Sequence, residues 1–240
     1  MIRLENLKIS FGKRIILEDA DATFKPATLA ALIGRNGTGK STLLRAIAGL
    51  NKNFSGRILI DGLEIRDMTP KQLATRLAFV NTHRPRIPNL TCREVVSLGR
   101  APYTDWLGKL KKSDIKIVEE SIEAVKMEDY SDRTLDTLSD GEFQRVMIAR
   151  ALAQSTSAIL LDEPTSFLDI PNRRQLVALL RNLAHQQEKC IIFSTHELDI
   201  ALRMCDEIAL IDNCHLYHSG VKEMTASKRI EELFRLNEDY

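Results

Sequence analysis

A glycine-rich loop near the start of the chain constrains the fold more than any other feature. It follows an apolar run, 29–33, and opens a helix-forming stretch, 41–48, that ends at Gly49. A strand, a loop and a helix in this order form a phosphate-binding loop, in which backbone N–H groups turn inward around an anion. The loop residues are Gly34, Arg35, Asn36, Gly37, Thr38, Gly39, Lys40 and Ser41, followed by Thr42.

Two side chains of this loop and an acidic pair predict one nucleotide site. Lys40 can reach the β- and γ-phosphates, and Ser41 can ligate Mg²⁺. The apolar run 158–161 leads into Asp162 and Glu163, and ligands bind at the carboxyl ends of parallel strands. Asp162 is therefore a candidate Mg²⁺ ligand, and Glu163 a candidate general base or water-orienting group. The alternative is a pair of surface carboxylates at a strand end.

Apolar periodicity predicts an α/β fold that contains two kinds of sheet. Continuous apolar runs are typical of strands buried on both faces of a parallel sheet. Alternating segments, with a hairpin signal at Asp61-Gly62, predict a small and partly antiparallel sheet. The continuous runs are 29–33, 158–161, 190–193 and 208–211, and the alternating segments are 2–11, 57–60 and 76–80.

The middle of the chain, 85–155, carries helix signals and no strong strand, so we expect an inserted helical subdomain. Ser113 is the expected N-cap of one helix, and Ser139 or Asp140 of another. Pro171 suits the first turn of a third helix.

Composition excludes several classes of protein. The net charge of +1, from 34 basic and 33 acidic residues, argues against nucleic acid as a partner. No apolar run approaches the roughly 18 residues that span a bilayer, and the alternating, charged start is unlike a signal peptide. We therefore expect a cytoplasmic protein whose membrane role depends on a partner. The four cysteines form no CxxC pair and are expected to be reduced and mostly buried; they are Cys92, Cys190, Cys205 and Cys214.

The segment Ser139-Asp140-Gly141-Glu142 precedes an amphipathic helix. Ser and Asp are good N-caps, so the segment can be a plain capping motif. A free helix N-terminus with a Ser hydroxyl and a Gly N–H can also hold a γ-phosphate. These residues alone leave both interpretations open.

In their order along the chain, five motifs resemble those of the ATP-binding-cassette ATPases over residues 1–225. The resemblance implies ATP and Mg²⁺ as ligands and a head-to-tail dimer, which we expect to be a homodimer. It implies a nucleotide-binding core with a β subdomain at 1–84 and 156–225, a helical subdomain with the signature motif at 85–155, and a C-terminal tail at 226–240. The motifs are the phosphate loop, Leu138-Ser139-Asp140-Gly141-Glu142, Leu161-Asp162-Glu163-Pro164-Thr165, Ser166-Phe167-Leu168-Asp169 and Ser194-Thr195-His196.

The same resemblance implies roles for individual residues. Ser139 and Gly141 would bind the nucleotide of the partner subunit, and Asp169 would lie in the loop that crosses the dimer seam. His196 would contact the γ-phosphate, although a histidine at a strand end can also be structural. Phe11 falls where the family places an aromatic ring on adenine, and its alternative role is that of a core strand residue.

The sequence departs from the family pattern at two positions. Asp140 replaces the first of two signature glycines, and an Asp at a helix start is locally favourable. Thr82 replaces a glutamine that contacts Mg²⁺ and the attacking water, and His83 is a possible substitute for it. A Thr hydroxyl can ligate Mg²⁺ but reaches less far than an amide, so Thr82 is a candidate catalytic and metal-binding residue.

Within the family, the segments 95–103 and 106–108 resemble the subunits of ferric siderophore, haem and cobalamin importers. That resemblance implies a polytopic membrane permease, a substrate-binding protein that feeds it, and a peripheral position on the inner face of the cell membrane. The alternatives are an exporter or lipoprotein-releasing ATPase, and a non-transport scaffold or assembly ATPase.

Apolar and aromatic residues mix with arginines at 83–110, which is typical of a protein-docking surface. In the family this region receives a short cytoplasmic helix of the membrane subunit. The alternative is that these side chains pack the helical subdomain. They are Ile87, Pro88, Leu90, Tyr103, Trp106 and Leu107, with Arg84, Arg86, Arg93 and Arg100.

Overall fold

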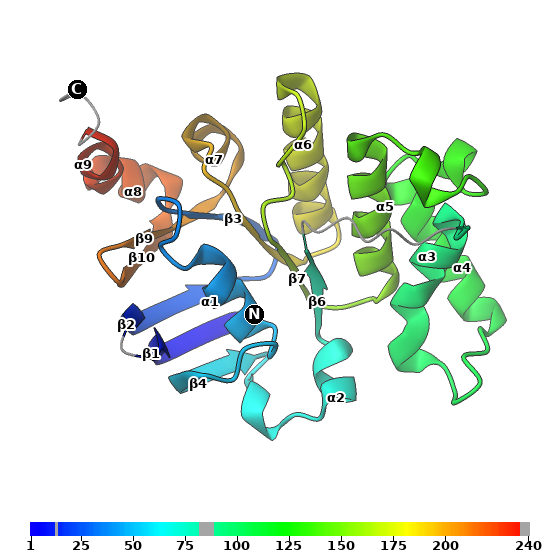
Figure 1. Cartoon of the computed structure of the whole chain (residues 1–240), viewed down its shortest axis with the longest axis horizontal. Helices are drawn as coiled ribbons and strands as arrows, with labels where there is room; N and C mark the ends of the chain where they lie inside the picture. The colour runs from blue at the N-terminus through cyan, green and yellow to red at the C-terminus, as the bar shows by residue number, and fades with distance from the viewer. Residues whose placement is uncertain (13, 82–88, 236–240) are drawn as a thin grey trace.

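A six-stranded, mainly parallel sheet forms the centre of the molecule in the computed structural model, which describes residues 1–12, 14–81 and 89–235 (Figure 1). The strand order is β10-β9-β3-β8-β7-β6, and only the β9–β10 hairpin is antiparallel. All four continuous apolar runs form strands of this sheet, as predicted. The strands are β3 (Thr28–Ile33), β6 (Leu77–Val80), β7 (Ala158–Leu161), β8 (Cys190–Ser194), β9 (Glu207–Asp212) and β10 (His215–Gly220).

A second sheet of four antiparallel strands has the order β2-β1-β4-β5. The prediction that 76–80 belongs to this sheet is wrong, because β6 pairs in parallel with β7, from Leu77 opposite Ala158 to Val80 opposite Leu161. The reason is burial: three of the four β6 residues are buried, as expected of a strand in a covered parallel sheet. The strands are β1 (Ile2–Phe11), β2 (Arg14–Phe24), β4 (Phe54–Ile60) and β5 (Leu63–Glu64).

Alternate residues of the central strands enter two different cores. On β3, Ala30 and Leu32 pack with the second sheet and α1 (Lys40–Ile47). Their neighbours Leu29, Ala31 and Ile33 face the opposite way, into a core shared with the other helices. Because successive side chains of a strand point to opposite faces, one strand holds both layers together.

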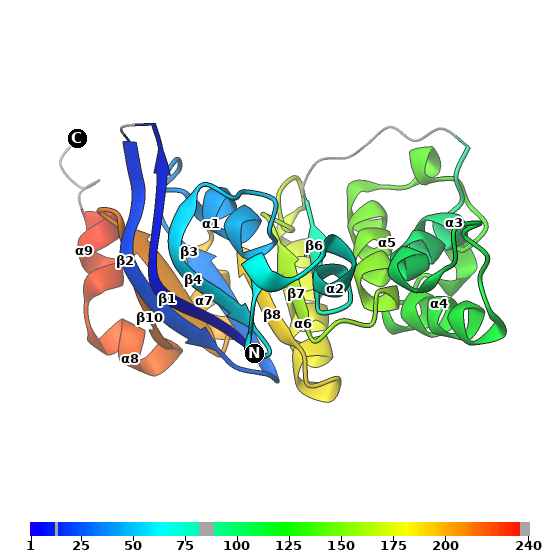
Figure 2. The same cartoon turned by 90° about the horizontal axis from the view of Figure 1, so that it is seen from below.

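Helices cover the sheet and form a separate group beyond β6. The views in Figures 1 and 2 agree that α3, α4 and α5 lie together on the far side of β6 from the second sheet. Pro171 lies in the first turn of α6, as predicted. The remaining helices are α2 (Pro70–Ala74), α3 (Cys92–Ser97), α4 (Lys112–Ala124), α5 (Asp140–Ala153), α6 (Ile170–Gln186), α7 (Leu198–Met204), α8 (Val221–Ala226) and α9 (Arg229–Arg235), with short 3₁₀ turns η1 (Ile65–Asp67), η2 (Leu98–Tyr103), η3 (Glu128–Tyr130) and η4 (Leu135–Thr137).

The prediction that Ser113 caps a helix is wrong. The N-cap of α4 is Lys111, whose backbone N–H donates to Asp114 Oδ2 at 2.9 Å. Asp114 also forms a buried ion pair with Arg100, at 2.9 Å between Nη2 and Oδ1. Since Arg100 belongs to η2 and also donates to the carbonyl of Ala153 at 2.8 Å, this pair fastens η2, α4 and the end of α5 together.

The four cysteines are free thiols, and three of them are buried, as predicted. Burial raises the pKa of Cys190 and of Cys205 to about 12. Within 1–12, 14–81 and 89–235, no helix has the length and apolar character that a membrane span requires.

Candidate functional site

The phosphate loop and the carboxyl ends of the central strands enclose a pocket of 580 Å³. The loop runs from β3 into α1, so that the first turn of α1 faces the cavity. This is the edge of a parallel sheet at which ligands bind. The pocket is lined by Phe11, Arg14, Ile16, Asn36, Gly37, Gly39, Lys40, Ser41, Thr42, Glu163 and His196.

Glycine is required at Gly39, the N-cap of α1. Its φ of +104° lies in the left-handed region, and a Cβ there would come within 2.1 Å of Ile16 Cγ2. Gly34 is also closely packed, because a Cβ would lie 2.7 Å from the carbonyl oxygen of Ile211. These approaches hold the loop tightly against β2 and β9.

Lys40 is a buried cation with an exposed fraction of 5%. Its Nζ donates to the carbonyl oxygens of Gly34 at 2.9 Å and Arg35 at 3.1 Å. Desolvation lowers the pKa of Lys40, while the charges of Glu163 and Asp162 oppose that shift. A buried ammonium held by neutral carbonyls is stabilised further by an anion, and a phosphate chain supplies one.

Ser41 and Asp162 meet at the floor of the site. Ser41 Oγ donates to Asp162 Oδ1 at 2.8 Å, and the buried Ser194 Oγ donates to the same oxygen at 2.8 Å. Two oxygens that ligate one Mg²⁺ at about 2.1 Å, at right angles, lie about 3.0 Å apart. The hydroxyl and carboxylate oxygens of Ser41 and Asp162 therefore suit Mg²⁺ in both type and separation.

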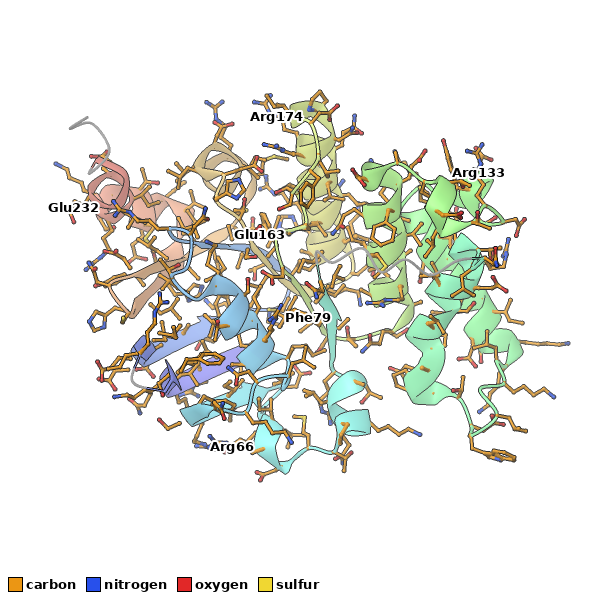
Figure 3. The ribbon with its side chains drawn as sticks, in the orientation of Figure 1. Arg66, Phe79, Arg133, Glu163, Arg174 and Glu232 are labelled. Carbon is orange, nitrogen blue, oxygen red and sulfur yellow. The ribbon has the colours of Figure 1, made fainter. Side chains whose placement is uncertain are left out.

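Glu163 follows Asp162 with a φ of +45°, which bends the chain out of β7. Its backbone N–H donates to Ser194 Oγ at 2.8 Å, and its Oε2 accepts from Ser166 Oγ at 3.1 Å. Figure 3 shows Glu163 near the centre of the molecule. Asp162 is buried and Glu163 lines the pocket, so the interpretation of these residues as a surface pair is wrong.

A second hollow of 570 Å³ adjoins the first, because Ser41 and Glu163 line both. Asn81, the last described residue before Thr82, contributes to its wall. Thr82 and His83 lie outside the described residues. The lining residues are Ser41, Arg45, Asn81, Asp162, Glu163, Ser166 and Phe167.

Phe11 is 57% exposed and lines the first pocket, so its alternative role as a core residue is wrong. His196 is exposed at the same pocket, beyond the end of β8. Sequence reasoning missed Arg14, whose Nη2 donates to the carbonyl of Gly37 at 3.1 Å. Arg14 pairs with Phe11 across the β1–β2 hairpin, a relation that only a prediction of β2 would have revealed.

Three other residues of the phosphate loop lie away from this pocket. Arg35 Nη2 donates to the carbonyl of Leu233 in α9 at 2.9 Å, and Thr38 Oγ1 donates to the Arg35 carbonyl at 2.9 Å. Arg35 and Thr38 line a smaller hollow of 310 Å³ that also reaches the β9–β10 turn, and Gly34 is buried. These residues stabilise the phosphate loop on its side away from the first pocket.

The signature segment is a helix N-terminus that faces solvent. Ser139 is the N-cap of α5, with a reciprocal capping box to Glu142, and the hydrogen bonds from Ser139 lower the pKa of Glu142. Neither Ser139 nor Gly141 is among the described residues that line the two hollows around the phosphate loop. Asp169 caps α6, accepting from the Asn172 N–H at 2.9 Å.

Comparison with known proteins assigns the family. The family model for the ABC transporter matches residues 17–166, a span that holds the phosphate loop, the signature segment and the acidic pair. The chain belongs to the ABC transporter family. The chain is therefore an ATPase with an ATP-binding domain.

Similar proteins extend over nearly the whole chain. An uncharacterized ABC transporter ATP-binding protein of Methanocaldococcus jannaschii, MJ0873, is 40% identical over 98% of this chain and 82% of its own length. The iron(3+)-hydroxamate import ATP-binding protein FhuC of Bacillus subtilis is 33% identical over 97% of this chain and 87% of its own. The structure of cbiO1 from Clostridium perfringens, part of the ABC transporter complex cbiONQ, has 27% identity and a TM-score of 0.83 over 99% of this chain and 95% of its own.

Proposed function

We propose that this chain is the ATP-hydrolysing subunit of an importer for an iron siderophore or cobalamin. The observation that carries the catalytic part is that Lys40, Ser41 and Glu163 line one pocket, while Asp162 bonds to Ser41 and lines the adjoining hollow. The import part is supported by the hydroxamate-import relative, which matches nearly the full chain. Purified protein should hydrolyse ATP in a Mg²⁺-dependent reaction, measured as phosphate release.

Each residue has a separate task in this proposal. The ammonium of Lys40 neutralises charge on the β- and γ-phosphates, and Ser41 and Asp162 hold Mg²⁺. Bound Mg²⁺ supplies Lewis-acid polarisation of the phosphoryl oxygens. Glu163 accepts a proton from water as the water oxygen bonds to the γ-phosphorus and the bond to ADP breaks.

The test of this role is Glu163→Gln, because an amide cannot accept that proton. We expect ATP binding to persist while steady-state hydrolysis falls about a hundredfold or more. Glu120→Gln, an exposed change on α4, is the matched control and should hydrolyse ATP normally. Unchanged turnover in Glu163→Gln would remove the catalytic assignment.

We further propose an ATP-driven homodimer in which each site is completed by the partner. Ser139 is exposed and lies outside its own chain's pocket, so its helix N-terminus is available to a second subunit. Phe167, which lines the second hollow, is 84% exposed, and Ile170, at the start of α6, is 64% exposed. Two such exposed apolar side chains support a surface that a partner covers.

Size exclusion of Glu163→Gln with ATP and Mg²⁺ tests the dimer. We expect a shift to twice the monomer mass, and we expect Ser139→Arg to abolish it because the larger side chain obstructs the seam. Ser113→Arg, an exposed substitution on α4, should leave the shift intact. A Ser139→Arg protein that still dimerises contradicts the sandwich arrangement.

The permease is proposed to dock in an apolar groove of 490 Å³ between the core and the end of α5. Leu50 on its rim is 66% exposed. β6 connects this groove to the nucleotide site, because its residues Leu77 and Phe79 line the groove and Asn81, directly after it, lines the hollow beside Glu163. Phe79 and Glu163 are labelled in Figure 3. The groove is lined by Ala48, Gly49, Leu50, Lys52, Ile65, Arg66, Met68, Pro70, Leu73, Ala74, Leu77, Phe79 and Gln154.

The proposed groove differs from the docking surface that the sequence led us to expect at 83–110. Arg100 is buried against Asp114 and Tyr103 donates to the Gln154 carbonyl at 3.0 Å, so both serve the helical group. Arg84, Arg86, Ile87 and Pro88 lie outside the described residues.

Substitution of an exposed leucine tests the groove. Leu50→Glu should prevent co-purification with the permease and abolish uptake while the isolated chain keeps its ATPase activity. Leu63→Glu, on the exposed edge strand β5, is the control and should preserve both. Normal uptake with Leu50→Glu would exclude the groove as the docking site.

The cargo is tested in cells. A deletion strain should lose uptake of an iron siderophore or cobalamin, and expression of the chain should restore it. A substrate-binding protein is expected to deliver the cargo to the permease. Normal uptake combined with loss of export or maturation of another molecule would contradict the import proposal and leave the ATPase assignment intact.

A further inference from the structure

The segment 104–112, which is the loop between η2 and α4 together with the first residue of α4, carries the most exposed large apolar side chain among the described residues. We call it the tip loop. Trp106 is 91% exposed and Leu107 is 67% exposed, and Ile115 in the first turn of α4 is 49% exposed. Large aromatic side chains bury much apolar area in a contact, and this burial stabilises the contact strongly. An exposed tryptophan in this position therefore indicates a contact surface.

The exposure is imposed by an ordered loop. Asp105 Oδ1 accepts the backbone N–H groups of Leu107 at 3.0 Å and Lys109 at 3.2 Å, and the Gly108 N–H donates to the Asp105 carbonyl at 3.0 Å. Gly108 adopts a φ of +70°, which glycine allows without strain. The turn therefore keeps Trp106 and Leu107 exposed to solvent on an ordered backbone. Binding of a partner would need little further ordering of this backbone.

The base of the tip loop is fixed to the helical group. The Arg100 guanidinium lies 3.9 Å from the centre of the Tyr103 ring and is buried in its pair with Asp114. Because Tyr103 precedes the tip loop and Asp114 follows it, both ends are anchored. A force on the tip loop would thus act on the whole helical group.

The charges of the tip loop favour lipid over protein as the occupant. Lys109, Lys111 and Lys112 are exposed, and Asp105, its one acidic residue, is engaged by backbone N–H groups. Lysine is depleted in the cores of protein interfaces. Tryptophan beside lysines is instead typical of the boundary between water and an anionic membrane, where the ring lies among headgroups and the ammonium groups meet lipid phosphates.

The placement of the tip loop agrees with this occupant. Figure 1 shows the η2–α4 connection on the same edge of the molecule as α2. Residues of α2 line the groove that we propose receives the permease. A permease seated there would bring the tip loop towards the surrounding bilayer, an orientation that rests on the proposed function.

We propose that the tip loop binds the surface of an anionic phospholipid bilayer, with Trp106 and Leu107 entering the headgroup region and the three lysines contacting lipid phosphates. This contact gives the ATPase a second attachment to the membrane beside its permease. It also ties the helical group, which carries the signature helix α5, to a fixed plane.

Trp106 is the single tryptophan of the chain, so its fluorescence reports on the tip loop directly. The purified full chain is titrated with vesicles of phosphatidylcholine and phosphatidylglycerol in equal parts. We expect a blue shift of the emission and co-sedimentation with these vesicles, both weakened by added salt. Pure phosphatidylcholine vesicles should produce little shift.

Lys109→Glu/Lys112→Glu keeps the reporter and should weaken partitioning roughly 25-fold or more, at about fivefold for each lysine. Lys25→Glu/Lys222→Glu makes the same charge change at two exposed sites outside the tip loop and should bind like wild type. No shift with anionic vesicles, or equal binding by both double variants, overturns the proposal. A shift that requires the solubilised permease identifies protein as the occupant and also overturns it. Because vesicle binding needs neither turnover nor transport, its failure is distinguishable from failure of the proposed function.

Discussion

Replacement of Ser194 by alanine is the sharpest test of how the carboxylate residues Asp162 and Glu163 are held. Its hydroxyl accepts the backbone N–H of Glu163 and donates to Asp162 Oδ1, each at 2.8 Å. The side chain is fully buried, with an exposed fraction of 0%. Since the substitution removes one oxygen and leaves Cβ in place, it affects hydrogen bonding and hardly changes packing.

The magnitude follows from the groups left behind. An unsatisfied buried N–H at Glu163 costs about 1–3 kcal/mol, and Asp162 loses one of two hydroxyl donors but keeps Ser41. We expect the free energy of unfolding to fall by about 2 kcal/mol, which in a chain of this size lowers Tm by roughly 4–8 °C. Urea and thermal unfolding without nucleotide measure both quantities.

The same substitution should affect catalysis. Without the Ser194 hydroxyl, Asp162 and Glu163 are no longer held to a common point, so we expect kcat to fall about tenfold or more. Ser219→Ala removes a hydroxyl with only a 3.4 Å bond to Gly220 and is the control, with an expected change within about 0.5 kcal/mol. If Ser194→Ala unfolds and turns over like Ser219→Ala, the hydroxyl bridge does not support the site.

Three further substitutions test separate features of the chain. A Cβ at Gly141 would lie 3.9 Å from its nearest neighbours, so Gly141→Ala should leave the unfolding free energy unchanged or raise it by up to about 1 kcal/mol, while size exclusion shows a weaker ATP-driven dimer. The hydrogen bond from the Lys111 N–H is the largest cause that lowers the pKa of Asp114 from 3.8, so its stabilisation is present above that pH and is lost as the pH falls through the lower folded pKa. Asp114→Asn should thus cost about 3 kcal/mol in urea unfolding at pH 7 and progressively less below pH 4. Thr82→Ala should reduce phosphate release about tenfold or less, and a loss as deep as that of Glu163→Gln would show that Thr82 carries the chemistry.

The parts of the site whose positions in the fold were predicted correctly are those whose residues are consecutive in the sequence. The phosphate loop and the pair Asp162-Glu163 each follow a fully apolar strand, so their position at one sheet edge follows from the parallel topology alone. Phe11 was placed at adenine by resemblance, and its exposure supports that position over the core.

The features that were missed depend on irregular pairing or on contacts between distant residues. β2 escaped prediction because its pairing with β1 has three register shifts, which break the alternation of apolar residues. Arg14 was missed with it. The assignment of β6 failed because an isolated four-residue apolar strand does not reveal which sheet it joins. The start of α4 was misplaced because Asp114, at the third helical position, accepts from the N-cap Lys111 N–H while the distant Arg100 holds Asp114 in place.

The alternation along the central strands makes the damage from a core substitution depend on whether the residue number is odd or even. On β3, β7 and β8, odd positions such as Ile159 and Phe193 face the helices, and even positions such as Leu160 and Ile192 face the second sheet. An enlarged side chain at an even position would press towards the second sheet, whose β1–β2 hairpin carries the proposed base-binding Phe11. The same enlargement one residue along would press towards the core of α5 and α6, whose N-termini we propose to meet a second subunit. If both proposals hold, substitutions at neighbouring positions of one strand change nucleotide affinity and assembly separately.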